Sequence, residues 1–325
     1  MTQSVASILS EIDRTPVPIR LRDGRHQLGL ESTPHRRDEH RAIYPSPTRS
    51  PQELCSLLAV AMEEDAEDDP YDADIDATLR AMEKDPAERP SPSYLRTTQA
   101  GQMSVAARAE LVAWMHDFSE HCRLAPRDLH RAVRCVDRFL SARKLDGGER
   151  RRLRLLGAAA VFAASKYEDA STTVTLSAVD VAGRAGSTGR EPLDAERELL
   201  AALGHRLGGP TADTFVDHLT RRDHQEGEVW RLAHHLADLT LLDYRCVAFP
   251  PSAVAASAIV LARRALCPDH DVSSWLADLI AAGYKLEELA GCMDAIYEMH
   301  ELVGVWPGCD QMMASYGKKY SLSRR

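Results

Sequence analysis

Two alanine-rich, nearly all-apolar stretches, at residues 155–164 and 252–266, most constrain the fold of this 325-residue chain. A helix that is apolar on every side must be enclosed by other elements. We therefore expect each stretch to be the central helix of its own helical set, and the recurrence after about a hundred residues indicates an internal duplication. No segment alternates convincingly at period two, so we predict an all-α chain.

Amphipathic segments flank both central stretches, and we predict two tandem five-helix domains, at residues 70–205 and 206–310, followed by a C-terminal tail at 311–325. A glycine-containing linker joins them at 204–210, and an N-terminal helix begins near Tyr71, where Tyr71, Ile75, Leu79 and Met82 recur at helical spacing. The helices of the two domains are expected around 111–122, 129–140, 152–166, 174–181 and 191–203, and then around 215–218, 229–241, 252–266, 275–280 and 286–300.

Residues 1–69 are polar, contain many prolines and end in an acidic run, so we predict a disordered tail. Five Ser-Pro or Thr-Pro dipeptides occur from this tail to the start of the first domain, and they match the minimal sites of proline-directed kinases. A polar, proline-rich spacer explains them equally well. The dipeptides begin at Thr15, Thr33, Ser46, Ser50 and Ser91.

Composition excludes several classes of function. The net charge of −9 argues against a nucleic-acid partner bound through a basic surface. Seven scattered cysteines are typical of reduced core residues in an intracellular protein, and the longest apolar stretch is too short to span a membrane. No metal-ligand spacing, phosphate-binding glycine loop or nucleophile with partners is present, so we expect no catalytic residue, no cofactor and no metal.

Glu196 is the most unusual residue of the predicted helix at 191–203. On a helical wheel it shares one face with Leu193, Leu200 and Leu203, where the pattern predicts an apolar residue. A half-buried carboxylate must find a cation or hydrogen-bond donors, or take up a proton. One interpretation is a local ion pair with Arg197 or Arg190.

Several motifs resemble the cyclin box in their order and spacing. From about Tyr71 to the C-terminus, the chain is similar to A/B-like cyclins. Its alanine- and arginine-rich composition resembles that of divergent plant cyclins. In the first domain the matching segments are residues 107–114 (ARAELVAW), 131–140 (RAVRCVDRFL), 155–168 (LLGAAAVFAASKYE) and 193–203; in the second they are 241–244 (LLDY), 250–252 (PPS) and 283–289 (GYKLEEL).

The resemblance implies roles for individual residues. Positions matching Lys166 and Glu196 bind a cyclin-dependent kinase at its regulatory helix, and we expect the two side chains to meet at one surface, unpaired within the chain. Leu155 and Tyr167 are expected to pack beside Lys166, with Tyr167 standing where most such cyclins have Phe. Positions matching Arg108 and Asp137 form a buried ion pair between the first two helices.

A second, weaker surface is implied near Trp114, where many cyclins bind Arg-x-Leu substrate peptides. Leu111, Trp114, Asp117 and Arg154 match this patch, but charged side chains at Glu110 and Arg154 replace the usual aliphatic residue and Gln, so we expect weakened docking. The tail segment 25–28 (RHQL) has the minimal Arg-x-x-Leu form of a destruction box, a pattern common by chance.

The resemblance implies a regulatory subunit that activates a cyclin-dependent kinase in cell-cycle control and supplies no catalytic group itself. It also implies residence inside the cell, in the nucleus, the cytoplasm or both. Two alternatives stay open. One is a transcription-associated protein with tandem cyclin folds, and the other is a divergent cyclin-fold scaffold that no longer binds a kinase.

Overall fold

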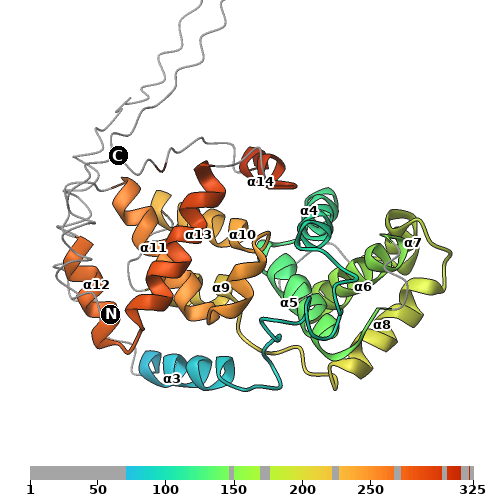
Figure 1. Ribbon diagram of the computed structural model, residues 1–325, viewed down its shortest axis with the longest axis horizontal. Coiled ribbons are helices and arrows are strands. Elements are labelled where there is room, and N and C mark those ends of the chain that lie inside the picture. The colour runs from blue at the N-terminus through green and yellow to red at the C-terminus, as the bar shows by residue number, and fades with distance from the viewer. Residues whose placement is uncertain are drawn as a thin grey trace, which may run out of the picture.

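The computed structural model describes residues 71–145, 150–168, 176–221, 227–266, 272–301, 306–315 and 322. All regular secondary structure in these residues is helical, and two helical sets lie side by side (Figure 1). The predicted all-α fold with two tandem sets is confirmed. The predicted disordered tail at 1–69, with its dipeptides at Thr15, Thr33, Ser46 and Ser50 and its 25–28 segment, lies outside the described residues.

The first set surrounds α6, whose residues 156–165 are all buried against its neighbours. Its alanines allow α5 and α8 to approach closely, which explains the small-residue composition. The predicted helix at 174–181 is displaced, because Ser177 caps a helix that runs from 178 to 185. The five helices are α4 (Val105–His121), α5 (Pro126–Ala142), α6 (Arg150–Glu168), α7 (Ala178–Ala185) and α8 (Glu191–Ala202).

The second set repeats this arrangement around α11, which is buried along most of its length. It is packed by α9, α10, α12 and α13, and a short 3₁₀ helix, η2 (Tyr244–Ala248), precedes it. These helices are α9 (Ala212–Thr220), α10 (Glu228–Thr240), α11 (Pro251–Leu266), α12 (Val272–Ala281) and α13 (Leu286–Glu301).

The N-terminal helix α3 (Asp72–Glu83) lies below the second set in Figure 1. The residues on its inward face differ from those predicted. Tyr71 and Met82 are exposed, whereas Asp72 and Glu83 are buried. Glu83 accepts hydrogen bonds from the backbone N and the hydroxyl of Ser252, at 3.1 and 2.8 Å, at the start of α11. A carboxylate is favoured there because a helix N-terminus carries partial positive charge.

A further helix, α14 (Cys309–Ser315), lies beside α4 of the first set in Figure 1. The predicted boundary between the second domain and a C-terminal tail at 310/311 falls inside this helix. Gly308 permits the contact, because a Cβ atom there would lie 2.1 Å from the Cβ of Ala113. Single-sequence periodicity missed α14 because a seven-residue helix shows too few turns for an apolar stripe to repeat.

Three arginines of α5 hold the linker between the two sets. Arg134 donates to the carbonyl oxygens of Pro210 and Glu88 at 2.9 and 2.6 Å. Arg138 donates to those of Arg206 and Ala87 at 2.6 and 2.9 Å. Arg131 donates to the carbonyl of Leu207. The α3–α4 connector and the linker are therefore bound by one helix face.

Within the described part of the chain, no helix combines the length and apolar character needed to cross a bilayer. The described cysteines, at 122, 135, 246, 292 and 309, are all free thiols.

Candidate functional site

The C-terminal end of α6 and the middle of α8 meet at the surface of the first set. Lys166 of α6 forms an ion pair there with Glu196 of α8, and the lysine side chain is 46% exposed while the carboxylate is 9% exposed. The Lys166 ammonium also lies 3.9 Å from the centroid of the Phe162 ring, close enough for a cation–π contact. The structure thus brings together two predicted residues that lie thirty positions apart.

The expectation that these two charges stay unpaired within the chain is wrong. Since α6 and α8 pack along each other, Lys166 reaches the buried carboxylate of Glu196 and offsets its charge. The alternative partner Arg197 binds Asp194 instead, at 2.8 Å. An ammonium has three N–H donors, so a half-exposed Lys166 that binds Glu196 retains donors for the carbonyl groups of a partner.

Glu196 lies on a slightly different helix face from the one predicted. The buried residues of α8 and its C-cap are Pro192, Glu196, Leu199 and Leu203, whereas Leu193 and Leu200 are only partly buried. The helix is therefore rotated by about one residue position relative to the predicted stripe. Glu196 remains on the inward face in both descriptions.

Tyr167 is 51% exposed and follows Lys166 on the same surface. The Arg131 guanidinium lies 4.5 Å from the centroid of its ring and also binds the carboxylate of Glu168. A Cβ atom on Gly208 would lie 2.9 Å from the Tyr167 hydroxyl, so the linker passes directly over that hydroxyl. Arg131 and the linker thereby fix the end of α6. The role of Arg131 was not predicted, although Arg131, Arg134 and Arg138 recur at helical spacing on the face of α5 opposite its apolar stripe.

Leu155 does not pack beside Lys166. Both lie on the continuous helix α6, and eleven residues at a rise of 1.5 Å separate them by about 16 Å. The resemblance placed the two in one functional group, but helix geometry puts Leu155 three turns away. Leu155 packs on the core of the first set instead.

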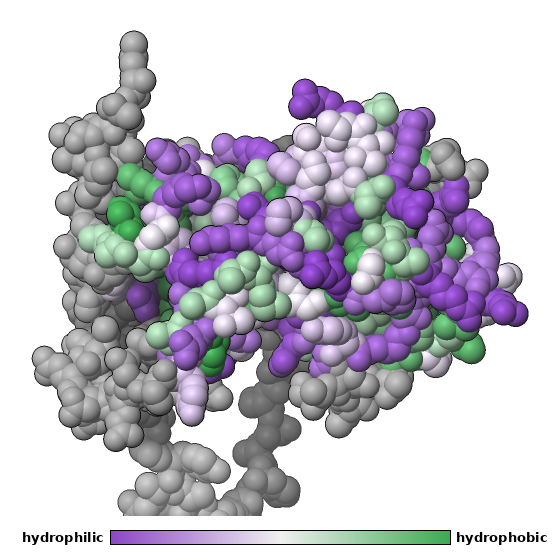
Figure 2. Space-filling model, turned by 90° about the horizontal axis from the view of Figure 1, so that it is seen from below, coloured by the Kyte–Doolittle hydropathy of each residue, from purple (hydrophilic) through white to green (hydrophobic). Residues whose placement is uncertain are grey.

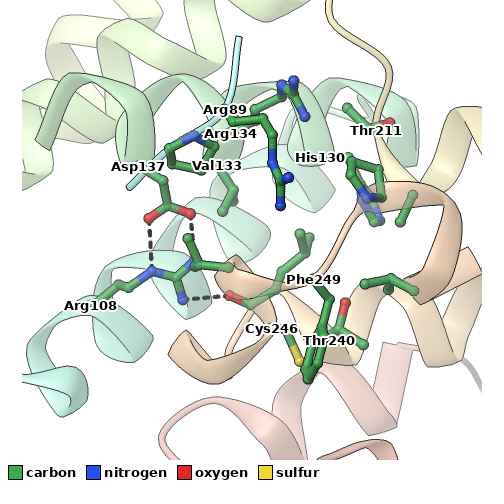
Figure 3. Close-up of a pocket in the computed structure, with 16 residues that line it drawn as sticks. Arg89, Arg108, His130, Val133, Arg134, Asp137, Thr211, Thr240, Cys246 and Phe249 are labelled. Atoms are coloured by element: carbon green, nitrogen blue, oxygen red, sulfur yellow. Dashed lines mark hydrogen bonds and ion pairs between the residues drawn. The ribbon is translucent and has the colours of Figure 1, made fainter. Parts of the chain in front are cut away.

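Arg108 and Asp137 form a buried two-point ion pair between α4 and α5, with N–O distances of 2.8 and 2.7 Å (Figure 3). The Tyr94 hydroxyl donates to the same carboxylate at 2.7 Å. Burial, together with the charge of Asp137, raises the pKa of the Tyr94 phenol well above its usual range, so it stays a donor. Arg108 also donates to the Leu241 carbonyl at 2.8 Å and so joins both helical sets.

A cavity of about 100 Å³ lies beside this ion pair, between the two sets (Figure 3). His130 and Arg134 of α5 line one side, and Thr240 and Cys246 line the other. Its small volume holds only a few water molecules. The arrangement supports a structural role for the ion pair and its surroundings.

The four residues predicted as a weakened docking patch line one surface groove of about 390 Å³. Its acidic groups are already bound, since Glu110 pairs with Arg150 and Asp117 lies 3.9 Å from Arg184. Pro307 and Gly308, next to α14, form part of its wall. The predicted residues are Leu111, Trp114, Asp117 and Arg154, and the Arg154 guanidinium lies 5.8 Å from the Trp114 ring centroid.

Among the described residues, no group of three or more His, Cys, Asp or Glu side chains is arranged to hold a metal ion. The chemistry available at the Lys166–Glu196 surface is hydrogen bonding and ion pairing with another molecule.

Sequence comparison gives two family matches that together span both helical sets. The model of the cyclin N-terminal domain matches residues 74–208, and that of the cyclin C-terminal domain matches residues 210–322. The two matches meet in the linker that the α5 arginines hold.

Two plant proteins illustrate the similarity. Cyclin-F2-2 of Oryza sativa subsp. japonica is 49% identical over 229 residues, which is 69% of this chain and 51% of that protein, so the match spans about half of the relative's length. G2/mitotic-specific cyclin C13-1 of Daucus carota is 33% identical over 235 residues, which covers 70% of this chain and 67% of that protein.

A solved structure shares the fold. The viral cyclin from herpesvirus saimiri superposes with a TM-score of 0.56 at 16% identity, covering 70% of this chain and 94% of the viral one.

Proposed function

The chain belongs to the cyclin family, and on that premise we propose that it is the regulatory subunit of a cyclin-dependent serine/threonine kinase and acts in cell-cycle control. The observation that carries this proposal is the Lys166–Glu196 pair, a half-exposed ammonium fixed over a buried carboxylate at the surface of the first set. The similarity to a mitotic-specific cyclin supports the cell-cycle assignment.

The proposed mechanism is selection of one kinase state. A cyclin-dependent kinase alone has its regulatory helix displaced, so its catalytic lysine lacks a glutamate partner. A rigid helical surface that binds this helix favours the active arrangement through its higher affinity for that state. The rigidity comes from Arg131, which ties the end of α6 to the linker, and the cyclin contributes no catalytic group. Such a partner implies residence in the nucleus, the cytoplasm or both.

Exchanging the two charges tests this proposal. Because Lys166 and Glu196 pair with each other, Lys166→Glu combined with Glu196→Lys allows the internal pair to re-form while it reverses the charge presented to a partner. We expect kinase binding in affinity purification to fall at least tenfold, which corresponds to about 1.4 kcal/mol, while helical content stays unchanged. Exchange of the solvent-exposed pair Asp194 and Arg197, on the same helix α8, is the matched control.

Unaltered kinase binding and activation by the Lys166/Glu196 exchange variant would remove the basis for the assignment. The scaffold alternative would then be favoured, because a cyclin fold without kinase binding predicts no effect. The transcription-associated alternative predicts loss of a different kinase, which mass spectrometry of the purified complex identifies.

We also propose that the Trp114 groove binds Arg-x-Leu peptides only weakly. Arg150 and Arg154 line the groove and repel the peptide arginine, and Glu110 and Asp117 are already bound to arginines of the chain. Isothermal titration with an Arg-x-Leu peptide should give dissociation constants above about 100 μM, and Arg154→Gln should tighten binding. Micromolar or tighter binding by the unaltered chain would contradict the proposal.

A further inference from the structure

A second surface cavity lies where the α3–α4 connector, the end of α5 and the linker after α8 meet. Its volume is about 790 Å³, and its lining includes Ser91 together with four basic residues and no acidic one. The basic residues are Lys84, Arg89, Arg138 and Arg206. In a chain with a net charge of −9, a cavity whose charged lining residues are all basic is a distinct local environment. Figure 2, viewed from the side of α3, shows hydrophilic and hydrophobic side chains interspersed on this face.

Not all of this positive charge is neutralised. Arg206 binds Asp85 at 3.1 Å, and Arg138 binds Glu88 at 2.9 Å. Lys84 and Arg89 make no ion pair with a carboxylate of the described residues, although Arg89 donates to the Ala248 carbonyl at 3.2 Å. The carboxyl ends of α5 and α8 border the cavity, but each contributes only about half a negative charge. Positive charge therefore remains in excess.

Ser91 combines a kinase recognition pattern with this environment. It stands between Pro90 and Pro92 and lies outside the helices, in backbone held by a hydrogen bond from its N–H to the Ser141 hydroxyl at 2.9 Å. Its own hydroxyl makes only long contacts, including one of 3.4 Å to the Ser93 hydroxyl. A following proline favours an extended conformation at Ser91 itself. A turn comes next, in which the Ser91 carbonyl accepts a hydrogen bond from the backbone N–H of Tyr94 at 3.2 Å.

We propose that Ser91 is a phosphorylation site of a proline-directed kinase and that the surrounding cations bind the phosphate. In the reaction, Ser91 Oγ forms a bond to the γ-phosphorus of ATP and the bond from that phosphorus to the β-bridging oxygen breaks. ADP leaves, and a base of the kinase takes the hydroxyl proton. The phosphate adds about −1.5 to −2 charges and three acceptor oxygens, which match the donors of Lys84, Arg89 and Arg206.

The modification would add a further link between two segments that α5 and the Arg206–Asp85 ion pair already connect. Ser91 belongs to the connector that follows α3, and Arg206 belongs to the linker between the two helical sets. A phosphate held by Lys84 and Arg206 stiffens the junction of the N-terminal helix, the first set and the linker. This consequence does not depend on the Lys166–Glu196 surface or on the identity of its partner.

The first experiment asks whether the hydroxyl is modified. The full chain, with the other four Ser-Pro and Thr-Pro residues changed to alanine, is incubated with a purified proline-directed kinase and ATP, and phosphate is located by mass spectrometry of peptides. We expect one phosphate on Ser91, retained in Ser93→Ala and lost in Ser91→Ala. Absence of phosphate from Ser91 overturns the proposal. The four changed residues are Thr15, Thr33, Ser46 and Ser50.

The second experiment asks whether the cavity binds the phosphate. Phosphoserine is incorporated at position 91 during translation, and the melting temperature is compared with that of the unmodified chain. A gain of about 2–4 °C is expected, reduced at high salt, and lost in Lys84→Ala with Arg206→Ala. Arg96→Ala, an exposed residue of the same connector outside the cavity, is the matched control and should keep the gain. A gain that survives the double substitution, or no gain at all, overturns the phosphate-binding role.

Discussion

Three charged side chains lie where little water reaches them, and groups of opposite charge or hydrogen-bond partners offset the charge of each. They are Arg108, Asp137 and His234. Arg108 and Asp137 satisfy each other and also bind Tyr94 and the Leu241 carbonyl. Such a network contributes little net stability over an apolar one, yet removal of one member leaves an uncompensated charge. At the residue scale, buried ion pairs and hydrogen bonds therefore specify the fold as much as the burial of apolar side chains does.

The contribution of His234 to the stability of the fold depends on pH. Burial alone would lower the pKa of its imidazole, but hydrogen bonds to Asp213 and Asp217, at 2.8 and 3.1 Å, outweigh burial and raise that pKa to about 9. In the unfolded chain this pKa is about 6.5. The stabilisation by the protonated histidine is therefore complete below about pH 6.5 and disappears as the pH rises to about 9.

We predict that His234→Gln destabilises the protein by roughly 2–3 kcal/mol near pH 6 and by much less above about pH 9. Urea unfolding at a series of pH values measures this difference. His235 does not interfere, because burial lowers the pKa of its imidazole to about 4 and its effect falls in the acid range. His121→Gln, at an exposed position, is the control. A difference that stays constant across this range would contradict the assignment of charge to His234.

At the scale of elements, the functional surface depends on how α6, α8 and the linker pack. The periodicity of the sequence predicted these helices to within a few residues, but it gave no information on which side chains face one another across them. Leu155 illustrates the limit, since it shares a motif with Lys166 but lies about 16 Å away along α6. Helix α14, which packs on α4, was not predicted at all.

Gly308 tests the contact between α14 and α4. It has a φ of +81°, and a Cβ atom there would lie 2.1 Å from the Ala113 Cβ, which cannot move aside as a flexible side chain could. We predict that Gly308→Ala destabilises the protein by about 1–3 kcal/mol and accelerates amide hydrogen exchange in α14. Gly183→Ala is the control, because a Cβ atom at Gly183 meets nothing within 4 Å. Unchanged exchange in α14 would show that the helix does not depend on this approach.

At the scale of the whole molecule, the two helical sets are joined by partly buried hydrogen bonds as well as by the linker. Arg108 reaches the Leu241 carbonyl at 2.8 Å, and His130 binds Asp238 at 2.8 Å. Both bonds run from the first set to the end of α10 in the second. Separation of the sets would break these bonds, at a net cost of about 0.5–1.5 kcal/mol for a neutral hydrogen bond and about 1.5–3 kcal/mol for one that involves a charged group.

We therefore predict that both sets unfold in one cooperative transition. Differential scanning calorimetry should give a single peak whose calorimetric and van't Hoff enthalpies agree. His130→Ala removes one of the bonds to the second set and should lower the melting temperature of the entire peak. Two resolved transitions in the unaltered chain would show that the sets are energetically independent.

The sequence alone determined the helical character, the duplication and the family, because apolar periodicity and motif spacing are local properties that one chain displays directly. It also identified Lys166 and Glu196 as exceptional residues. Only the tertiary structure decided that these two charges bind each other, that Arg131 holds the end of α6, and that a basic cavity surrounds Ser91. Those contacts join residues separated by about thirty to more than a hundred positions, and their geometry depends on how whole helices pack, which no local pattern specifies.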